Sequence, residues 1–123
     1  MLVDSSLWIP TLRESGAAAE RERVTSLIRS GEAAWCAAVR LELWSGVGDA
    51  RERKRLADLL AVVRELPMHP QVWEDAIALA ERGRRKGMKF PYPDLLIFSC
   101  AREHGVELAH QDKHFDLLAR LQA

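Results

Sequence analysis

The sequence predicts a single α/β domain in which helices cover a mainly parallel sheet, and two observations lead to this prediction. Short apolar runs alternate repeatedly with longer stretches of helical spacing. The stretch from Leu95 to Ala101 is apolar at nearly every position, which is typical of a helix covered on more than one side. We therefore expect residues 1–123 to form one layered domain around one core.

The predicted elements follow one another in a regular order. Strands are predicted at 1–3, 33–37 and 106–109, with a brief connection or edge strand at 66–68 that contains Pro67. Helical spacing predicts a first turn at 7–9 and helices at 17–29, 38–44, 50–66, 70–85, 94–101 and from 113 onward.

Composition excludes several classes of protein. Eighteen Lys and Arg balance eighteen Asp and Glu, so no overall field attracts nucleic acid or a membrane surface, although a local cluster of cations could still bind RNA. Cys36 and Cys100 lie among apolar residues and lack the spacing of a zinc site. We expect buried thiols, no membrane segment and a cytoplasmic location.

Asp94 stands at the start of the most apolar helix. Pro91 and Pro93 stiffen the approach and place this carboxylate in or beside the first helical turn. Two interpretations are open: Asp94 caps unpaired N–H groups of the helix, or it belongs to an acidic site at the edge of the core.

Three further acids are candidates for such a site. Asp4 and Asp112 directly follow predicted strands, where parallel sheets bind ligands, and Glu42 lies among apolar residues of a predicted helix. Capping explains the aspartates equally well, and solvent exposure explains Glu42. If all the acids converge, a hard divalent cation keeps them ionised, and oxygen ligands favour Mg²⁺ or Mn²⁺. Such a site suits phosphodiester hydrolysis.

Basic residues cluster after the helix at 70–85. Arg84, Arg85 and Lys86 either complement the carboxyl end of that helix or bind the phosphates of RNA. The basic run at 51–55 is expected to be a solvated helix face.

Together the acidic motifs resemble those of PIN-domain nucleases, and most closely those of VapC-type toxins. The resemblance spans the chain and rests on segments 1–9, 42–46, 93–101 and 108–115. It implies a three-layer α/β/α fold and a pocket in which Asp4, Glu42, Asp94 and Asp112 surround Mg²⁺ or Mn²⁺. It also implies endonucleolytic cleavage of RNA, a homodimer, and inhibition by a small antitoxin.

Some residues near these motifs have less defined roles. The resemblance suggests that Ser6 orients a carboxylate through a hydrogen bond, and that Asp116 is either a further acid or solvated. His110 stands where the family commonly has a small hydroxyl residue, and we expect it to contact phosphate or to pack. His114 is expected to face solvent.

Two other functions compete with the nuclease. In a non-catalytic PIN-like module the acids are caps, and the basic cluster binds RNA or protein. A receiver-like phosphoacceptor needs an acidic pair after the first strand and a lysine after the last, which Asp4-Ser5-Ser6 and Ala109-His110-Gln111 do not supply. Of the four tryptophans, at least half are expected in the core and the others at a partner surface.

Overall fold

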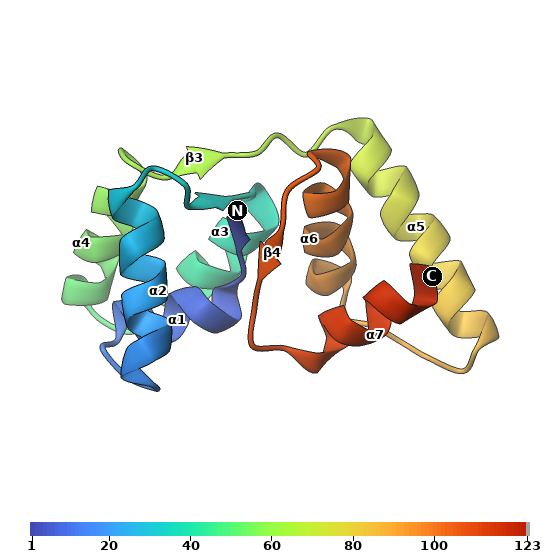
Figure 1. Ribbon diagram of the computed structural model, residues 1–123, viewed down its shortest axis with the longest axis horizontal. Coiled ribbons are helices and arrows are strands. Elements are labelled where there is room, and N and C mark those ends of the chain that lie inside the picture. Colours follow the sequence, from blue (N-terminus) through green and yellow to red (C-terminus); the bar gives the residue numbers. More distant parts are fainter. Residues whose placement is uncertain (123) are drawn as a thin grey trace.

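The computed structural model describes residues 1–122 and confirms the α/β class (Figure 1). The strands are β1 (Leu2–Val3), β2 (Ala34–Trp35), β3 (Arg64–Glu65) and β4 (Leu108–Ala109). The helices are α1 (Ser5–Leu12), α2 (Ala18–Arg29), α3 (Ala37–Ser45), α4 (Ala50–Leu59), α5 (Pro70–Arg85), α6 (Tyr92–Glu103) and α7 (Lys113–Gln122). No helix within this part of the chain is long and apolar enough to cross a bilayer.

The strands form one sheet in the order β3-β2-β1-β4, and each neighbouring pair is parallel. Leu2 pairs with Leu108 and Val3 pairs with Ala109, so the carboxyl ends of β1 and β4 lie side by side. Because the residue after each end leaves the sheet on the same edge, this register brings the two following loops together.

Helices cover both sides of the sheet. Figure 1 shows α1, α2 and α4 on one side of the strands and α5, α6 and α7 on the other, while α3 contacts α1, α4 and α6. The core includes Trp8 and Trp35, whose rings lie 5.5 Å apart. Cys36 and Cys100 are buried free thiols, as the sequence predicts.

The predicted boundaries differ most from the structure at three elements. Helix α4 ends at Leu59 instead of 66, because the chain turns there and places Val63 and Leu66 in the core on either side of β3. The edge strand accordingly lies two residues earlier than predicted. Helix α1 is longer than the predicted single turn and continues through Pro10, which removes one backbone hydrogen-bond donor from the helix.

Candidate acidic metal site

The first acid, Asp4, joins β1 to α1. Its backbone N–H donates to the carbonyl of Ala109 across 2.9 Å, which ties it to the end of β4. Its Oδ2 accepts the N–H of Ser6 and so caps α1. The side chain is buried, and Oδ1 has no hydrogen-bond partner within residues 1–122. Capping therefore occupies only one of the two carboxylate oxygens.

Glu42 reaches the same region from α3. Its Oε1 accepts a hydrogen bond of 3.0 Å from the hydroxyl of Ser5, the first residue of α1. The side chain is half-buried, so solvent exposure alone does not explain this residue. The contact links α3 to the end of β1.

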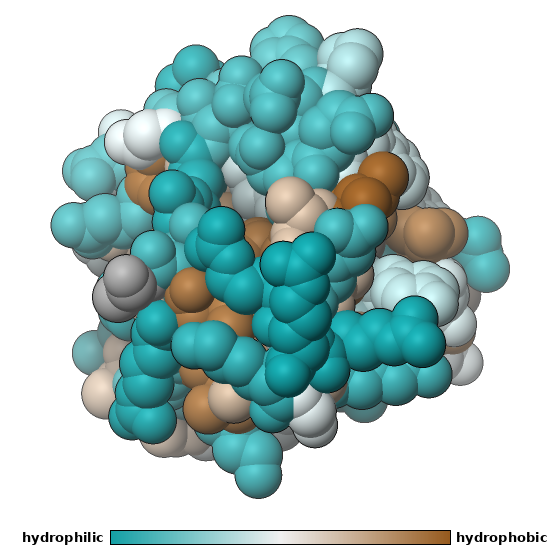
Figure 2. All heavy atoms as spheres, turned by 90° about the vertical axis from the view of Figure 1, so that its right-hand side faces the viewer, coloured by the Kyte–Doolittle hydropathy of each residue, from teal (hydrophilic) through white to brown (hydrophobic). Residues whose placement is uncertain are grey.

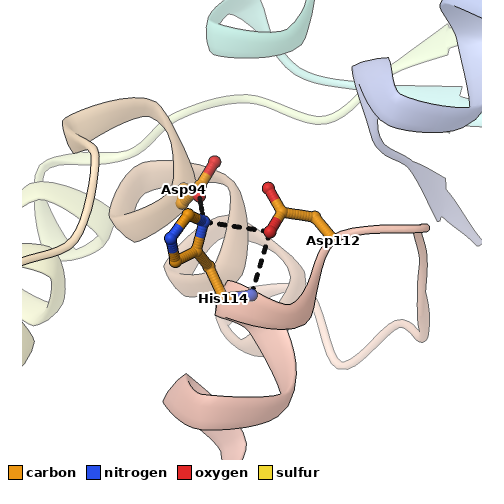
Figure 3. Close-up of side chains that lie close together, drawn as sticks. All are labelled: Asp94, Asp112 and His114. Atoms are coloured by element: carbon orange, nitrogen blue, oxygen red, sulfur yellow. Dashed lines mark hydrogen bonds and ion pairs between the residues drawn. The ribbon is translucent and has the colours of Figure 1, made fainter.

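Asp94, Asp112 and His114 converge at the start of α7 (Figure 3). Nδ1 of His114 lies 3.0 Å from Oδ2 of Asp94 and 2.9 Å from Oδ1 of Asp112. Asp94 comes from the first turn of α6, and Asp112 from the loop after β4. Each residue contributes one ligand atom, and these atoms all lie within 4.8 Å of one another. The prediction that His114 faces solvent is therefore wrong.

The electrostatics of the site indicate that the acids are close to one another. Burial raises the pKa of Asp94 to about 7, and repulsion from Asp112, Asp4 and Glu42 adds to this effect, while His114 opposes it. Burial also raises the pKa of Glu42; the hydrogen bond from Ser5 opposes the rise, and the charges of Asp4 and Asp112 support it. Each of the four predicted acids thus repels at least one of the others.

These residues fit a divalent cation. Oδ1 of Asp4 and Oδ2 of Asp94 are buried oxygens without a hydrogen-bond donor in the described chain, and both belong to side chains that are more than nine-tenths buried. Buried carboxylate oxygens without donors are costly unless a cation or a proton compensates them. The same burial and repulsion that raise the pKa of Asp94 make a cation favourable there.

The predicted supporting residues take different positions. The hydroxyl of Ser6 accepts the N–H of Gln111 at 2.9 Å, and its backbone N–H, not its hydroxyl, holds Asp4. The hydroxyl that binds a carboxylate is that of Ser5. His110 packs on Phe115 with ring centroids 4.9 Å apart, and its Nδ1 accepts the N–H of Asp112. Asp116 is exposed and lies 3.9 Å from Nε2 of His110, outside the converging group.

The basic cluster lies on the surface at the end of α5. No ion pair within residues 1–122 involves Arg84, Arg85 or Lys86. Arg84 and Phe90 line a groove of about 430 Å³. The ring of Phe90 meets the ring of His114 edge to face at 6.3 Å, so this groove borders the acid site. The face that carries α5 is mainly hydrophilic, with small hydrophobic areas between the charged groups (Figure 2).

Sequence reasoning missed two residues of the site, Ser5 and His114. Ser5 could have been found from its place immediately after a capping aspartate, where a helix begins. For His114 the available signal was its position two residues after Asp112, at the start of a predicted helix. An aspartate in that position can accept the backbone N–H of His114 and so hold the two residues together.

Comparison with known proteins places this arrangement in a family. A model of the PIN domain matches residues 1–121. Ribonuclease VapC11 of Mycobacterium tuberculosis is 29% identical over 125 residues, which cover 98% of this chain and 92% of that protein.

Solved structures show the same fold. The VapBC2 complex of Rickettsia felis, bound to a DNA fragment from its promoter, contains a chain that superposes with a TM-score of 0.76 at 16% identity, covering 91% of this chain and 86% of that one. VapC20 of Mycobacterium tuberculosis, a toxin that cleaves the sarcin-ricin loop, superposes with a TM-score of 0.68 at 20% identity, covering 94% and 92%.

Proposed function

Because the chain belongs to the PIN-domain family, we propose that it is a metal-dependent endoribonuclease and the toxin of a VapBC-type toxin–antitoxin pair. The observation that carries this proposal is the convergence of Asp4, Glu42, Asp94 and Asp112 on one edge of the sheet. Two of these acids have a buried oxygen that accepts no hydrogen bond within residues 1–122. The ribonuclease names of the relatives support the reaction, and the cytoplasm, which holds cellular RNA, is the proposed location.

Asp4, Asp94 and Asp112 are the residues proposed to hold Mg²⁺ or Mn²⁺. When bound, such a cation supplies the positive charge that polarises a phosphodiester and lowers the pKa of a water molecule. Glu42 orients the attacking water: Ser5 occupies its Oε1, so Oε2 is the atom that accepts a proton from that water. Cleavage then leaves a 3′-hydroxyl and a 5′-phosphate, and no side chain acts as nucleophile.

The basic cluster is proposed to bind the RNA backbone. Within residues 1–122, Arg84, Arg85 and Lys86 form no ion pair, whereas three cations of the α4 run do: Arg51, Lys54 and Arg55. Cations that form no ion pair in the described part of the chain, near a groove that borders the acid site, are suited to bind phosphates.

An apolar groove is proposed to receive the antitoxin. It has a volume of about 440 Å³ and its lining includes Leu41, Trp73 and Tyr92, all strongly exposed, together with Glu42. Because Glu42 forms part of the wall, an antitoxin segment in this groove would cover the acid site. Ile77, one turn after Trp73 on α5 and also exposed, extends the apolar surface and is proposed to serve the homodimer.

The test is RNA cleavage by purified Asp4→Asn and Asp94→Asn variants. Each is expected to lose at least about 10²-fold in rate, because charge stabilisation at the reacting phosphate is lost. EDTA is expected to stop the parent enzyme, and added Mg²⁺ or Mn²⁺ to restore it. Asp58→Asn, an exposed acid on α4, is the control and is expected to cleave normally.

The same experiment tests the non-catalytic alternative. RNA binding that depends on salt but not on metal, without cleavage by the parent protein, would favour the binding module. Full activity in either active-site variant would reject the role assigned to that aspartate.

A further inference from the structure

We propose that Nδ1 of His114 is a ligand of the cation, beside Asp94 and Asp112, and that this mixed nitrogen and oxygen site therefore prefers Mn²⁺ to Mg²⁺. The inference rests on the proposed function for the presence of a cation. It goes further in adding a ligand outside the acidic set and in naming the metal that this ligand selects.

The distances are those of neighbouring ligands around one ion. Adjacent ligands of an octahedral cation with bonds of about 2.1 Å lie about 3.0 Å apart. Nδ1 of His114 lies 3.0 Å from Oδ2 of Asp94 and 2.9 Å from Oδ1 of Asp112. The three side chains, one from α6 and two from the junction of the β4 loop with α7, point toward one another in Figure 3. One ion could therefore contact all three atoms without a large rearrangement.

A simple hydrogen bond explains this arrangement less well. Nδ1 carries at most one hydrogen, which can point at only one of the two carboxylates. Within residues 1–122, Nδ1 of His114 and Oδ2 of Asp94 are both buried atoms that make no hydrogen bond of acceptable geometry, despite their short separation. The carboxylate of Asp94 is itself buried, so water does not readily replace the missing partner. A cation between the atoms satisfies both.

The surroundings hold the imidazole ring in this position. The backbone N–H of His114 donates to Oδ1 of Asp112 across 2.9 Å, which fixes the two ligands relative to each other. The buried ring of Phe90 contacts the imidazole edge to face, at an interplanar angle of 81°. The absence of a side chain at Gly83 makes room for the ring of Phe90, because a Cβ added at Gly83 would lie 3.0 Å from that ring. The ligand is thus oriented before any metal binds.

The nitrogen changes which metal the site prefers. Mg²⁺ binds oxygen ligands and retains its waters, whereas imidazole suits transition metals, and Mn²⁺ accepts both nitrogen and carboxylate. We therefore expect the protein to bind Mn²⁺ at least about tenfold more tightly than Mg²⁺.

The experiment measures metal binding directly, without RNA. Metal-free protein is titrated with MnCl₂ or MgCl₂ by calorimetry, and the Mn²⁺-loaded protein is examined by pulsed electron paramagnetic resonance, which detects a directly bound ¹⁴N. The parent protein is expected to show ¹⁴N coupling. His114→Phe keeps a ring against Phe90 and is expected to lose the coupling, while His114→Asp replaces nitrogen by oxygen and is expected to remove the preference for Mn²⁺.

Controls separate His114 from other histidines. His104 follows the carboxyl end of α6, and its Nε2 contacts the carbonyl of Pro67, away from the acid site. The His104→Gln variant is therefore expected to keep the ¹⁴N coupling. Coupling that survives in His114→Phe but disappears in His110→Gln would overturn the assignment. The assignment would also be overturned if the parent protein cleaves RNA and binds Mn²⁺ but shows no ¹⁴N coupling. Coupling in a parent protein that does not cleave RNA would instead support the ligand and reject the nuclease.

Discussion

The hydroxyl of Ser5 donates a hydrogen bond to Oε1 of Glu42 across 3.0 Å, and so connects the start of α1 with the middle of α3. Ser5 is itself buried and directly follows the capping residue Asp4. The contact orients Glu42 and partly offsets the effects that raise its pKa.

Ser5→Ala is expected to lower kcat about tenfold, because the misplaced Glu42 then orients water less well, at a cost of about 1.4 kcal/mol in the barrier. Loss of the hydrogen bond raises the pKa of Glu42 further, so the acid side of the pH–rate profile is expected to move to higher pH. Thr11→Ala, which removes a hydroxyl bound to the carbonyl of Leu7 on the same helix, serves as control. An unchanged pH profile in Ser5→Ala would contradict the role given to Ser5.

The stability of the metal-free protein is expected to fall as pH rises. Asp94 has a pKa of about 7 when folded and an ordinary value of 3.8, so between these values the folded state binds more protons than the unfolded state. The contribution of Asp94 to the free energy of unfolding is therefore fully present below about pH 4 and is lost as pH rises through about 7. Between these values the free energy of unfolding falls by up to about 1.4 kcal/mol per pH unit.

Urea unfolding at several pH values, in the presence of EDTA, measures this slope. Asp94→Asn removes the titrating group and is expected to flatten the curve between pH 5 and 7. Saturating Mn²⁺ is expected to reverse the trend in the parent protein, since the cation binds the ionised carboxylate and stabilises the folded state. The same slope in Asp94→Asn as in the parent protein would show that Asp94 is not its source.

Gly83→Ala is expected to destabilise the protein by about 1 kcal/mol, although alanine favours a helix over glycine. The added Cβ would approach Cε2 of Phe90 to 3.0 Å, and the buried ring has little room to move. Denaturation of single and double variants measures the effect. In a Phe90→Leu background the same change is expected to be neutral or stabilising, because the crowding is gone and the helix preference remains.

The helices were largely predictable, and the strands less so, for physical reasons. The helices have long apolar stripes, whereas each strand has only two residues. Arg64 and Glu65 of β3 are both exposed, so no hydrophobic pattern marks that strand. The apolar residues beyond Leu59 extend the helical pattern of α4, although they pack around β3 instead.

The convergence of the acids followed from strand ends, but the details of the site did not. A parallel sheet brings the loops after β1 and β4 together, which made Asp4 and Asp112 candidates. Ser5 and Ser6 differ by one helical position, about 100° of rotation, and only the exact start of α1 decides which hydroxyl meets Glu42. The direction of His114 depends on how Asp112 caps α7, a tertiary feature that the sequence pattern does not contain.

Arg84→Ala/Arg85→Ala/Lys86→Ala is expected to weaken RNA binding and to reduce the salt dependence of that binding. Each lost phosphate contact reduces the magnitude of the slope of log K against log salt by about 0.7 for single-stranded RNA. The slope of the triple variant is therefore expected to be smaller in magnitude by up to about 2. Binding measured in EDTA at several salt concentrations isolates this effect from cleavage.

The matched control is Arg51→Ala/Arg53→Ala/Lys54→Ala, which removes as many charges from the solvated face of α4. Arg51 pairs with Glu14 at 3.8 Å and Lys54 with Asp58 at 3.3 Å, while Arg53 lies over the ring of Trp44. Since both variants change the net charge equally, a general electrostatic effect would reduce their salt slopes to the same extent. A smaller slope in the α5 variant alone would place the RNA beside the groove that Arg84 and Phe90 line, next to the acid site.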